Sequence, residues 1–313
     1  MTQQIAFVFP GQGSQSVGML DKLAQSHATV QQTFEEASDA VSVDLWALAS
    51  NGPAEDLNQT FNTQPAMLAA GVAVWRVWQQ LQGASPVMMA GHSLGEYTAL
   101  VCAGAISFGD AAALVAERGR LMQEAVPKGE GAMAAILGLD DEQVRTLCDQ
   151  AAEGNVVEAV NFNSPGQVVI AGSAAAVERA MELAKEAGAR RAIPLPVSVP
   201  SHCALMKPAA VKLQLKLADV AIAPPGITVI HNVSVTSESD AEEIRQHLVE
   251  QLYAPVRWVE TVQKMQADGV GMLVEAGPGK VLTGLARRID RKLKAVALFE
   301  PQGFDDLLES TNE

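Results

Sequence analysis

Cysteine and aromatic residues are scarce in this chain. Its 313 residues include three cysteines, and phenylalanine, tryptophan and tyrosine together make up 4% of them. Cys102, Cys148 and Cys203 lack the C-x-x-C spacing of zinc and redox motifs, and the histidines form no cluster with acidic residues in the sequence. These absences argue against a disulfide framework and against a metal site, and they favour a cytoplasmic protein.

Long hydrophobic runs and a surplus of positive charge are also missing. No segment reaches the roughly 18 uncharged apolar residues of a transmembrane helix, and the N-terminus lacks the basic region and cleavage site of an export signal. With 36 acidic against 22 basic residues the net charge is -14, which repels nucleic acid. We therefore expect a protein that neither spans a membrane nor binds nucleic acid.

Aliphatic residues are abundant, and 48% of the chain is hydrophobic, which is enough for a large core of helices packed on buried strands. The pattern predicts an α/β fold. A strand at residues 4–9 leads into a glycine-containing loop, residues 10–15, whose N–H groups can face a ligand. Helices are predicted at residues 17–26, 29–38, 65–81 and 110–125, with Asp110 as the cap of the last one.

The periodicity changes near residue 130. Strands are predicted at residues 131–137, 156–161, 167–171 and 190–195, with helices at 140–152 and 174–187. This βαββαβ order is that of a ferredoxin-like unit, so we expect an inserted subdomain at 129–196 within a discontinuous domain formed by 1–128 and 197–313. The larger domain continues with elements at 208–217, 228–232, 241–251, 272–275 and 279–289, and its acidic C-terminal end is expected to fray.

The pentapeptide Gly91-His92-Ser93-Leu94-Gly95 lies between a predicted strand and a predicted helix. A strand that turns abruptly into a helix needs small residues two positions before and after a nucleophilic serine. We interpret Ser93 as that nucleophile, with the Leu94 N–H directed at an oxyanion beside it. A tight structural turn is the alternative.

A nucleophilic serine needs a base, and the five histidines differ in their surroundings. His202 lies in a proline-rich loop, the kind of stiff segment that holds catalytic side chains, and it is the candidate base, with a structural histidine as the alternative. His92 is too near Ser93 in sequence to serve, and we assign it to the substrate cleft. The other three are His27 and His247 on polar helical faces and His231 at a strand end with no obvious partner. An acid or a carbonyl oxygen would orient the imidazole.

Arg118 lies on a helix rich in apolar residues, where a charge requires a reason. It is either a snorkelling or glutamate-paired arginine, or a bidentate clamp for a substrate carboxylate. The glycine-rich segments do not have the spacing of a dinucleotide loop or a P-loop.

Six segments of the chain together resemble one enzyme family, the bacterial malonyl-CoA:acyl carrier protein transacylases. The similarity extends in the same order from the first strand to about residue 300. The segments are FPGQGSQ (9–15), GHSLGEY (91–97), ERG (117–119), NFNSPGQ (161–167), VPSHCALM (199–206) and EAGPG (275–279).

The resemblance implies an α/β-hydrolase-like core with a parallel sheet plus a ferredoxin-like insert. It implies a malonyl transfer through a malonyl-serine ester, a coenzyme A thioester as substrate, and no bound metal or redox cofactor. The residue roles that it implies are Ser93 as nucleophile, His202 as base, the Gln251 main-chain carbonyl as orienting group, the Gln12 and Leu94 N–H groups as oxyanion hole, and Arg118, His92 and Asn161 at the substrate.

The resemblance also implies two partners, malonyl-CoA and an acyl carrier protein. Carrier protein is acidic, so docking to this acidic chain needs a local basic surface. We expect a monomer, and the candidate docking residues are Lys280, Arg287, Arg288, Arg291, Lys292 and Lys294, with Arg190 and Arg191 as a second basic site. The alternatives are a serine hydrolase, a polyketide-type acyltransferase and a non-catalytic scaffold that binds acyl groups or carrier protein.

Overall fold

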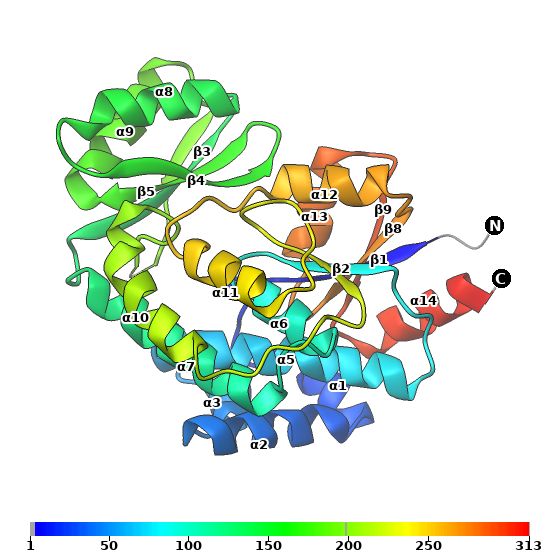
Figure 1. Cartoon of the computed structure of the whole chain (residues 1–313). Helices are drawn as coiled ribbons and strands as arrows, with labels where there is room; N and C mark the ends of the chain where they lie inside the picture. The colour runs from blue at the N-terminus through cyan, green and yellow to red at the C-terminus, as the bar shows by residue number, and fades with distance from the viewer. Residues whose placement is uncertain (1–3, 198, 313) are drawn as a thin grey trace.

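A five-stranded parallel sheet forms the centre of the larger part of the molecule (Figure 1). The structure is a computed structural model that describes residues 4–197 and 199–312. The strand order is β7-β2-β1-β8-β9, and every neighbouring pair is parallel. The strands are β1 (Ile5–Phe9), β2 (Met88–Gly91), β7 (Thr228–Ile230), β8 (Met272–Ala276) and β9 (Lys294–Leu298). The α/β prediction is confirmed.

Both faces of this sheet are covered, because successive strand residues point to opposite sides. In β1, Ile5, Phe7 and Phe9 belong to the large hydrophobic core, and Ala6 and Val8 belong to a smaller one. Helices α5 and α6 pack in the large core, and α12 and α13 pack in the small one. These helices are α5 (Thr60–Gln80), α6 (Gly95–Cys102), α12 (Trp258–Ala267) and α13 (Val281–Ile289).

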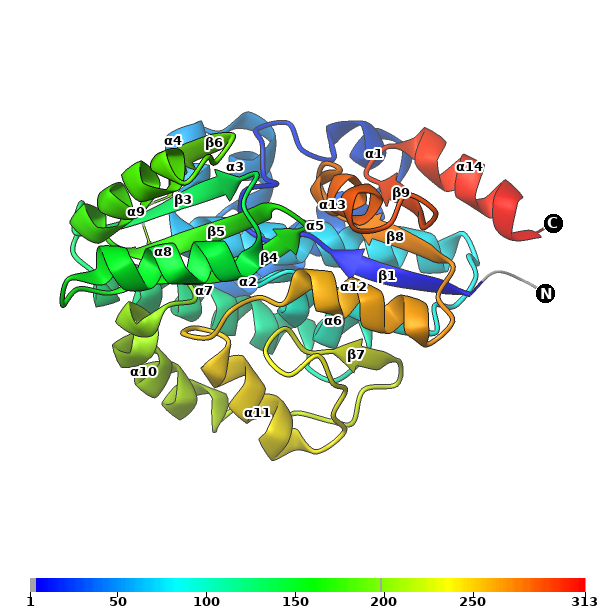
Figure 2. The ribbon, with the colours of Figure 1, turned by 90° about the horizontal axis from the view of Figure 1, so that it is seen from above.

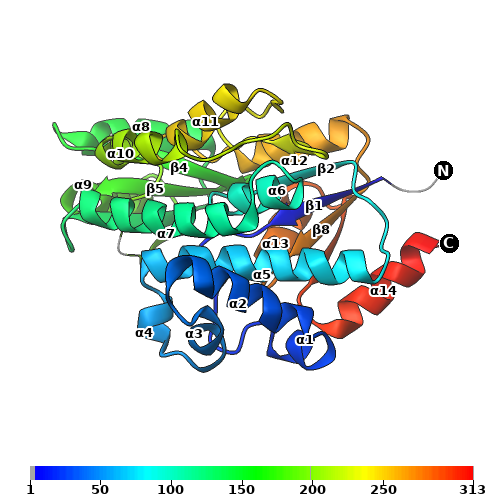
Figure 3. The ribbon, with the colours of Figure 1, turned by 60° about the horizontal axis from the view of Figure 1, so that its bottom comes forward.

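The remaining helices build outward from the large core, with α2 on the outer side of α5 (Figure 3). They are α1 (Asp21–Ser26), α2 (Thr29–Val41), α3 (Leu45–Asn51), α4 (Ala54–Leu57), α7 (Phe108–Ala125), α10 (Lys207–Leu217), α11 (Ala241–Glu250) and α14 (Pro301–Asn312), with a 3-10 turn at Ala204–Met206.

A separate antiparallel sheet has the strand order β4-β5-β3-β6. With its two helices it has the βαββαβ order that the sequence predicts, and the ferredoxin-like insert is confirmed as a fold. Seen from above, this sheet lies beside the parallel sheet, with α12 and α13 next to the end of β4 (Figure 2). The elements are β3 (Gly131–Leu137), α8 (Asp141–Ala152), β4 (Val157–Ser164), β5 (Gln167–Ser173), α9 (Ala174–Glu186) and β6 (Arg191–Pro194). The domain limits at residues 129 and 196 stay a prediction.

Several element predictions were wrong in detail. Helix α7 begins at Phe108, and Ser107 rather than Asp110 is its cap, because the Ser107 hydroxyl accepts from the Asp110 N–H. Instead of a frayed end, the chain forms α14 as far as Asn312, with Phe304 and Leu307 buried. Helices α3, α4 and α12 and strand β9 were not predicted.

Candidate active site

Ser93 lies on a strained turn between β2 and α6. Its φ is 52°, in the left-handed region that residues with a side chain rarely adopt. The two flanking glycines leave room for this turn. A Cβ on Gly91 would lie 1.7 Å from the Gly95 carbonyl carbon, and one on Gly95 would lie 2.0 Å from the Phe9 carbonyl oxygen. The sequence therefore holds Ser93 at the carboxyl edge of the parallel sheet, where α/β proteins bind their ligands.

His202 is in hydrogen-bonding contact with Ser93. Its Nε2 lies 2.8 Å from Ser93 Oγ, and its Nδ1 lies 2.7 Å from the main-chain oxygen of Gln251. Since that carbonyl can only accept, Nδ1 carries a proton and the Nε2 lone pair of the neutral ring faces the hydroxyl. The ring is 2% exposed, and burial together with the Arg118 cation lowers the His202 pKa to about 3. His202 is thus a neutral base at physiological pH.

Arg118 brings a buried positive charge to the same point. It is 1% exposed, and its guanidinium donates to Gln64 Oε1 at 2.8 Å and to Gln251 Oε1 at 2.9 Å. The Nη2 atom of Arg118 also lies 3.5 Å from Ser93 Oγ. In the part of the chain that the structure describes, no carboxylate forms a salt bridge with Arg118, so the glutamate-paired interpretation does not hold. The burial of Arg118 rules out a snorkelling side chain, whose charged end would reach solvent. Neutral amides orient this cation and leave its charge available.

A small cavity of about 100 Å³ lies in front of these groups. A single water needs roughly 10–15 Å³ of cavity volume, so the cavity has room for a small acyl group but not for a long acyl chain. Neither the Gln12 nor the Leu94 N–H has an acceptor among the described residues. Every predicted site residue except Gln251 lines it: Gln12, His92, Ser93, Leu94, Arg118, Asn161 and His202.

His92 and Asn161 both line the cavity in front of Ser93. His92 Nε2 lies 2.8 Å from Asn163 Oδ1, and burial lowers the His92 pKa. The buried Oδ1 of Asn161 has no hydrogen-bond partner within the described chain, so it is a polar atom free for a ligand. Asn163 was missed by the sequence analysis, although it lies in the same NFNSPGQ segment.

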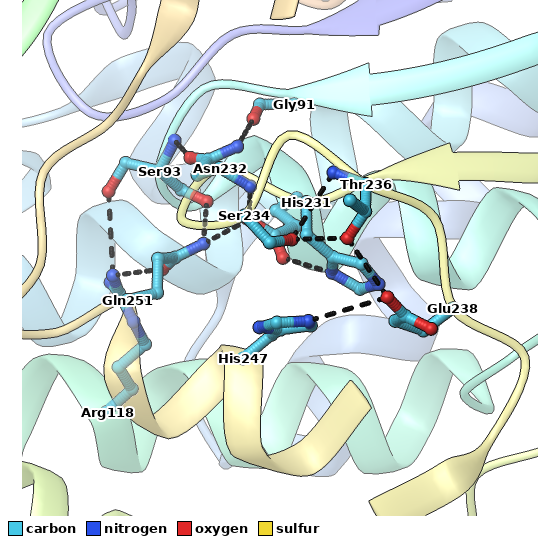
Figure 4. Close-up of polar contacts among 11 residues, drawn as sticks. Gly91, Ser93, Arg118, His231, Asn232, Ser234, Thr236, Glu238, His247 and Gln251 are labelled. Atoms are coloured by element: carbon cyan, nitrogen blue, oxygen red, sulfur yellow. Dashed lines mark hydrogen bonds and ion pairs between the residues drawn. The ribbon is translucent and has the colours of Figure 1, made fainter. Parts of the chain in front are cut away.

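A second group of residues, behind the elbow, was also missed (Figure 4). His231 is fully buried and its Nδ1 lies 2.7 Å from Glu96 Oε1, so the prediction that it has no partner was wrong. The centroid of the His247 ring lies 4.8 Å from that of His231, with the rings tilted by 35°, and the His247 side chain is mostly buried rather than solvated. Two signals were available: Glu96 follows the elbow in an otherwise apolar helix, and His231 directly follows a buried strand.

Other features of the described chain do not compete with this site. No group of His, Cys, Asp or Glu among the described residues is arranged to hold a metal ion, and none of the described helices is long and apolar enough to cross a membrane. A larger cavity of about 570 Å³ lies between α10 and α11, and none of the predicted site residues lines it.

Comparisons with known proteins agree on one family. The model of the acyl transferase domain matches residues 6–297. Curated malonyl CoA-acyl carrier protein transacylases are similar over nearly their full length. That of Escherichia coli K12 is 61% identical (98% of this chain, 99% of that one), and that of Bacillus subtilis 168 is 47% identical (99% and 98%).

Solved structures are equally similar. The acyl carrier protein S-malonyltransferase of Vibrio cholerae has a TM-score of 0.95 and 60% identity, covering 97% of this chain and 99% of that one. A malonyl-transacylase solved with a type II PKS acyl-carrier protein has a TM-score of 0.97 and 57% identity, covering 98% and 99%.

Proposed function

The chain belongs to the acyl transferase family, among the malonyl-CoA:acyl carrier protein transacylases, and from this premise we propose how its residues carry out the transfer. The reaction moves a malonyl group from malonyl-CoA to the phosphopantetheine thiol of acyl carrier protein and supplies fatty acid biosynthesis. One observation carries the assignment of roles: a strained serine touches both a neutral, oriented histidine and a buried arginine that two glutamine amides hold in place.

The first half-reaction loads Ser93. His202 Nε2 takes the hydroxyl proton as Oγ attacks the thioester carbonyl, and the N–H groups of Gln12 and Leu94 stabilise the resulting oxyanion. The tetrahedral intermediate collapses by breaking its carbon–sulfur bond. The coenzyme A thiolate leaves and takes the proton from His202, and malonyl remains on Ser93 as an ester.

The second half-reaction runs through the same groups in reverse. His202 deprotonates the phosphopantetheine thiol, and the thiolate attacks the ester carbonyl. The carbon–oxygen bond breaks, and Ser93 Oγ regains its proton from His202. Both steps are redox-neutral acyl transfers, so the proposed mechanism includes no metal or redox cofactor and follows a ping-pong order.

Arg118 selects the acyl group in this proposal. Among the described residues its charge next to Ser93 Oγ has no direct ion pair, so it suits the free carboxylate of malonyl, and the fork of the guanidinium matches that carboxylate. A bound malonyl group also fills much of the small cavity, which keeps water from the ester. His92 and Asn161 are proposed to contact the substrate from the cavity wall.

The proposed docking surface for carrier protein combines the two predicted basic sites. Arg191 and Gln167 flank Leu137 in neighbouring strands of the small sheet, and Arg288 Nη1 donates to Gln167 Oε1. Arg288 on α13 and Arg191 on β6 therefore belong to one continuous surface. Its members are exposed: Arg190, Arg191, Lys280, Arg287, Arg288, Arg291, Lys292 and Lys294.

This surface connects to the active site through the chain that follows β6. Leu195 comes directly after β6 and lines the cavity in front of Ser93. At about 3.3 Å per extended residue, Arg191 and Leu195 are separated by roughly 13 Å. A carrier protein on the basic surface is therefore placed beside the cavity. We also propose a cytoplasmic location, in keeping with the free thiols of the three cysteines, and a monomer.

Intact-protein mass spectrometry tests the function. Brief mixing with malonyl-CoA should add one malonyl mass to the protein and none to Ser93→Ala, and carrier protein bearing its phosphopantetheine arm should remove that mass as malonyl-carrier. A serine hydrolase would instead release free malonate without carrier protein. A scaffold would form no adduct.

A further inference from the structure

A buried carboxylate lies directly behind the catalytic groups. Glu96, in the first turn of α6, is fully buried. It accepts from three donors: His231 Nδ1 at 2.7 Å, the Asn232 main-chain N–H at 3.0 Å and Gln251 Nε2 at 2.7 Å. A buried carboxylate is costly unless its lone pairs are satisfied, and these three donors satisfy it.

Glu96 sets the direction of the Gln251 amide. A carboxylate only accepts, so the Gln251 NH₂ must face it, and the same Nε2 also donates to the Ser93 main-chain oxygen at 3.0 Å. The amide oxygen is thereby turned toward Arg118 (Figure 4). In the flipped amide two acceptors would meet at Glu96, and two donors would meet at Arg118.

The same carboxylate reaches the nucleophile through Asn232. The Asn232 main-chain N–H donates to Glu96. The Asn232 side chain accepts from the Ser93 N–H at 2.7 Å and donates to the Gly91 oxygen at 2.6 Å. The Asn232 amide therefore spans the strained turn and is visible beside it in Figure 4. Gln251 in turn supplies the main-chain oxygen that orients His202.

We propose that Glu96, held by His231, is a positioning residue for malonyl transfer. It orients Gln251 and Asn232, and these two residues in turn hold Arg118, His202 and Ser93 at their observed distances from one another. This rests on the proposed function. The carboxylate touches no substrate, and its effect on malonyl selection passes through the Gln251 side chain to Arg118.

The experiment compares Glu96→Gln with Glu275→Gln. Glu275 is a matched control because it is also fully buried and also accepts three hydrogen bonds, but all of these come from Leu282 and Thr283 in α13. The readouts are the rate of malonyl-Ser93 formation and the ratio of kcat/KM for malonyl-CoA to that for acetyl-CoA, with circular dichroism to check folding.

Glu96→Gln should lower the loading rate at least tenfold and lower the malonyl-to-acetyl ratio at least fivefold, because its amide presents a donor where only acceptors fit. Glu275→Gln should lose stability and keep the ratio. A folded Glu96→Gln protein with a wild-type rate and ratio would overturn the proposal, and so would an equal change of ratio in Glu275→Gln.

Gln251→Leu keeps the proposal testable if Glu96→Gln fails to fold. It retains the main-chain oxygen for His202 and removes the amide between Glu96 and Arg118, so the malonyl-to-acetyl ratio should fall. An unchanged ratio would refute the proposed connection. If the wild-type protein itself forms no malonyl adduct, the proposed function fails, which is distinct from failure of the Glu96 proposal.

Discussion

At the scale of single residues, the proposed basis of selectivity is that neutral amides hold Arg118 in place and that no described carboxylate touches it. Two glutamine oxygens accept from its guanidinium, so its position is fixed. The Glu96 carboxylate lies behind Gln251 and acts on Arg118 without touching it, so a direct ion pair must come from a ligand. Leaving a buried charge partner without its counterion costs several kcal/mol. The site therefore disfavours acyl groups that lack a carboxylate.

Arg118→Ala should lower kcat/KM for malonyl-CoA by about a hundredfold, equivalent to about 3 kcal/mol, and should narrow the preference over acetyl-CoA. Arg118→Lys is the matched control: it keeps a charge but loses the planar fork, so an intermediate preference is expected. Steady-state kinetics with both thioesters measure the ratio. A malonyl-to-acetyl ratio unchanged in Arg118→Ala would contradict the assignment.

The neutral state of His202 predicts a stability that depends on pH. Its pKa is about 3 in the folded protein, whereas the ordinary value is 6.5. Between these values the unfolded chain binds a proton that the folded chain does not, so the free energy of unfolding falls as pH falls below 6.5. At about 1.36 kcal/mol per pH unit, lowering the pH from 6.5 to 5.0 removes about 2 kcal/mol through this residue.

Urea unfolding of the wild type and of His202→Asn at several pH values between 5 and 7.5 isolates this effect, since all other titrating groups are shared. The variant should lose less stability on acidification than the wild type. Parallel curves would show that His202 is not kept neutral by the fold. The lowered pKa values of His92 and His247 act in the same direction and are present in both proteins.

At the scale of elements, the turn from β2 into α6 carries Ser93, the proposed nucleophile. Its two flanking glycines are needed because a side chain at either position would overlap main-chain atoms. Gly95→Ala should destabilise the protein by roughly 3 kcal/mol and abolish loading of Ser93, because the new methyl overlaps the Phe9 main chain. Gly284→Ala is the control, as its Cβ enters open space within α13 and should add about 0.5–1 kcal/mol. Thermal unfolding compares the two. Equal melting temperatures would contradict the steric argument.

The sequence was informative where a pattern is local. The elbow glycines and the βαββαβ order follow from neighbouring residues and periodicity, whereas the parallel sheet was implied by the family resemblance and its edge strand β9 was missed. Ser107 three residues before Asp110 was a readable cap signal that the prediction misassigned. Phe304 and Leu307 share a helical face that buries α14, but the acidic composition around them obscured it.

The contacts of Glu96 could not be read in this way. Its partners His231, Asn232 and Gln251 come from the ends of β7 and α11, more than 130 residues along the chain, and only the sheet order brings β7 beside β2. Motifs and periodicity assign a residue's role from the residues next to it in the chain. They cannot show which buried polar groups meet across elements that are distant in sequence.

At the scale of the whole molecule, one local surface is basic although the chain as a whole is acidic. The chain carries a net charge of -14, yet the basic surface that joins β6, β5 and α13 is exposed. On the proposed docking surface an acidic carrier protein would meet positive charge, whereas the net charge of the rest of the chain would repel it. Electrostatic contacts of this kind change association more than chemistry.

Arg287→Glu/Arg288→Glu should therefore raise KM for carrier protein about tenfold and leave KM for malonyl-CoA unchanged, since exposed ion pairs contribute roughly 0.2–1 kcal/mol each and reversal adds repulsion. Lys185→Glu/Lys212→Glu makes the same change in net charge on α9 and α10 and should leave both constants near the wild type.

Added salt should raise KM for carrier protein more steeply in the wild type than in the arginine variant, because screening removes contacts that the variant already lacks. If both double variants raise KM equally, net charge and not this surface governs docking; if KM for malonyl-CoA rises as well, the substitutions have reached the cavity through α13.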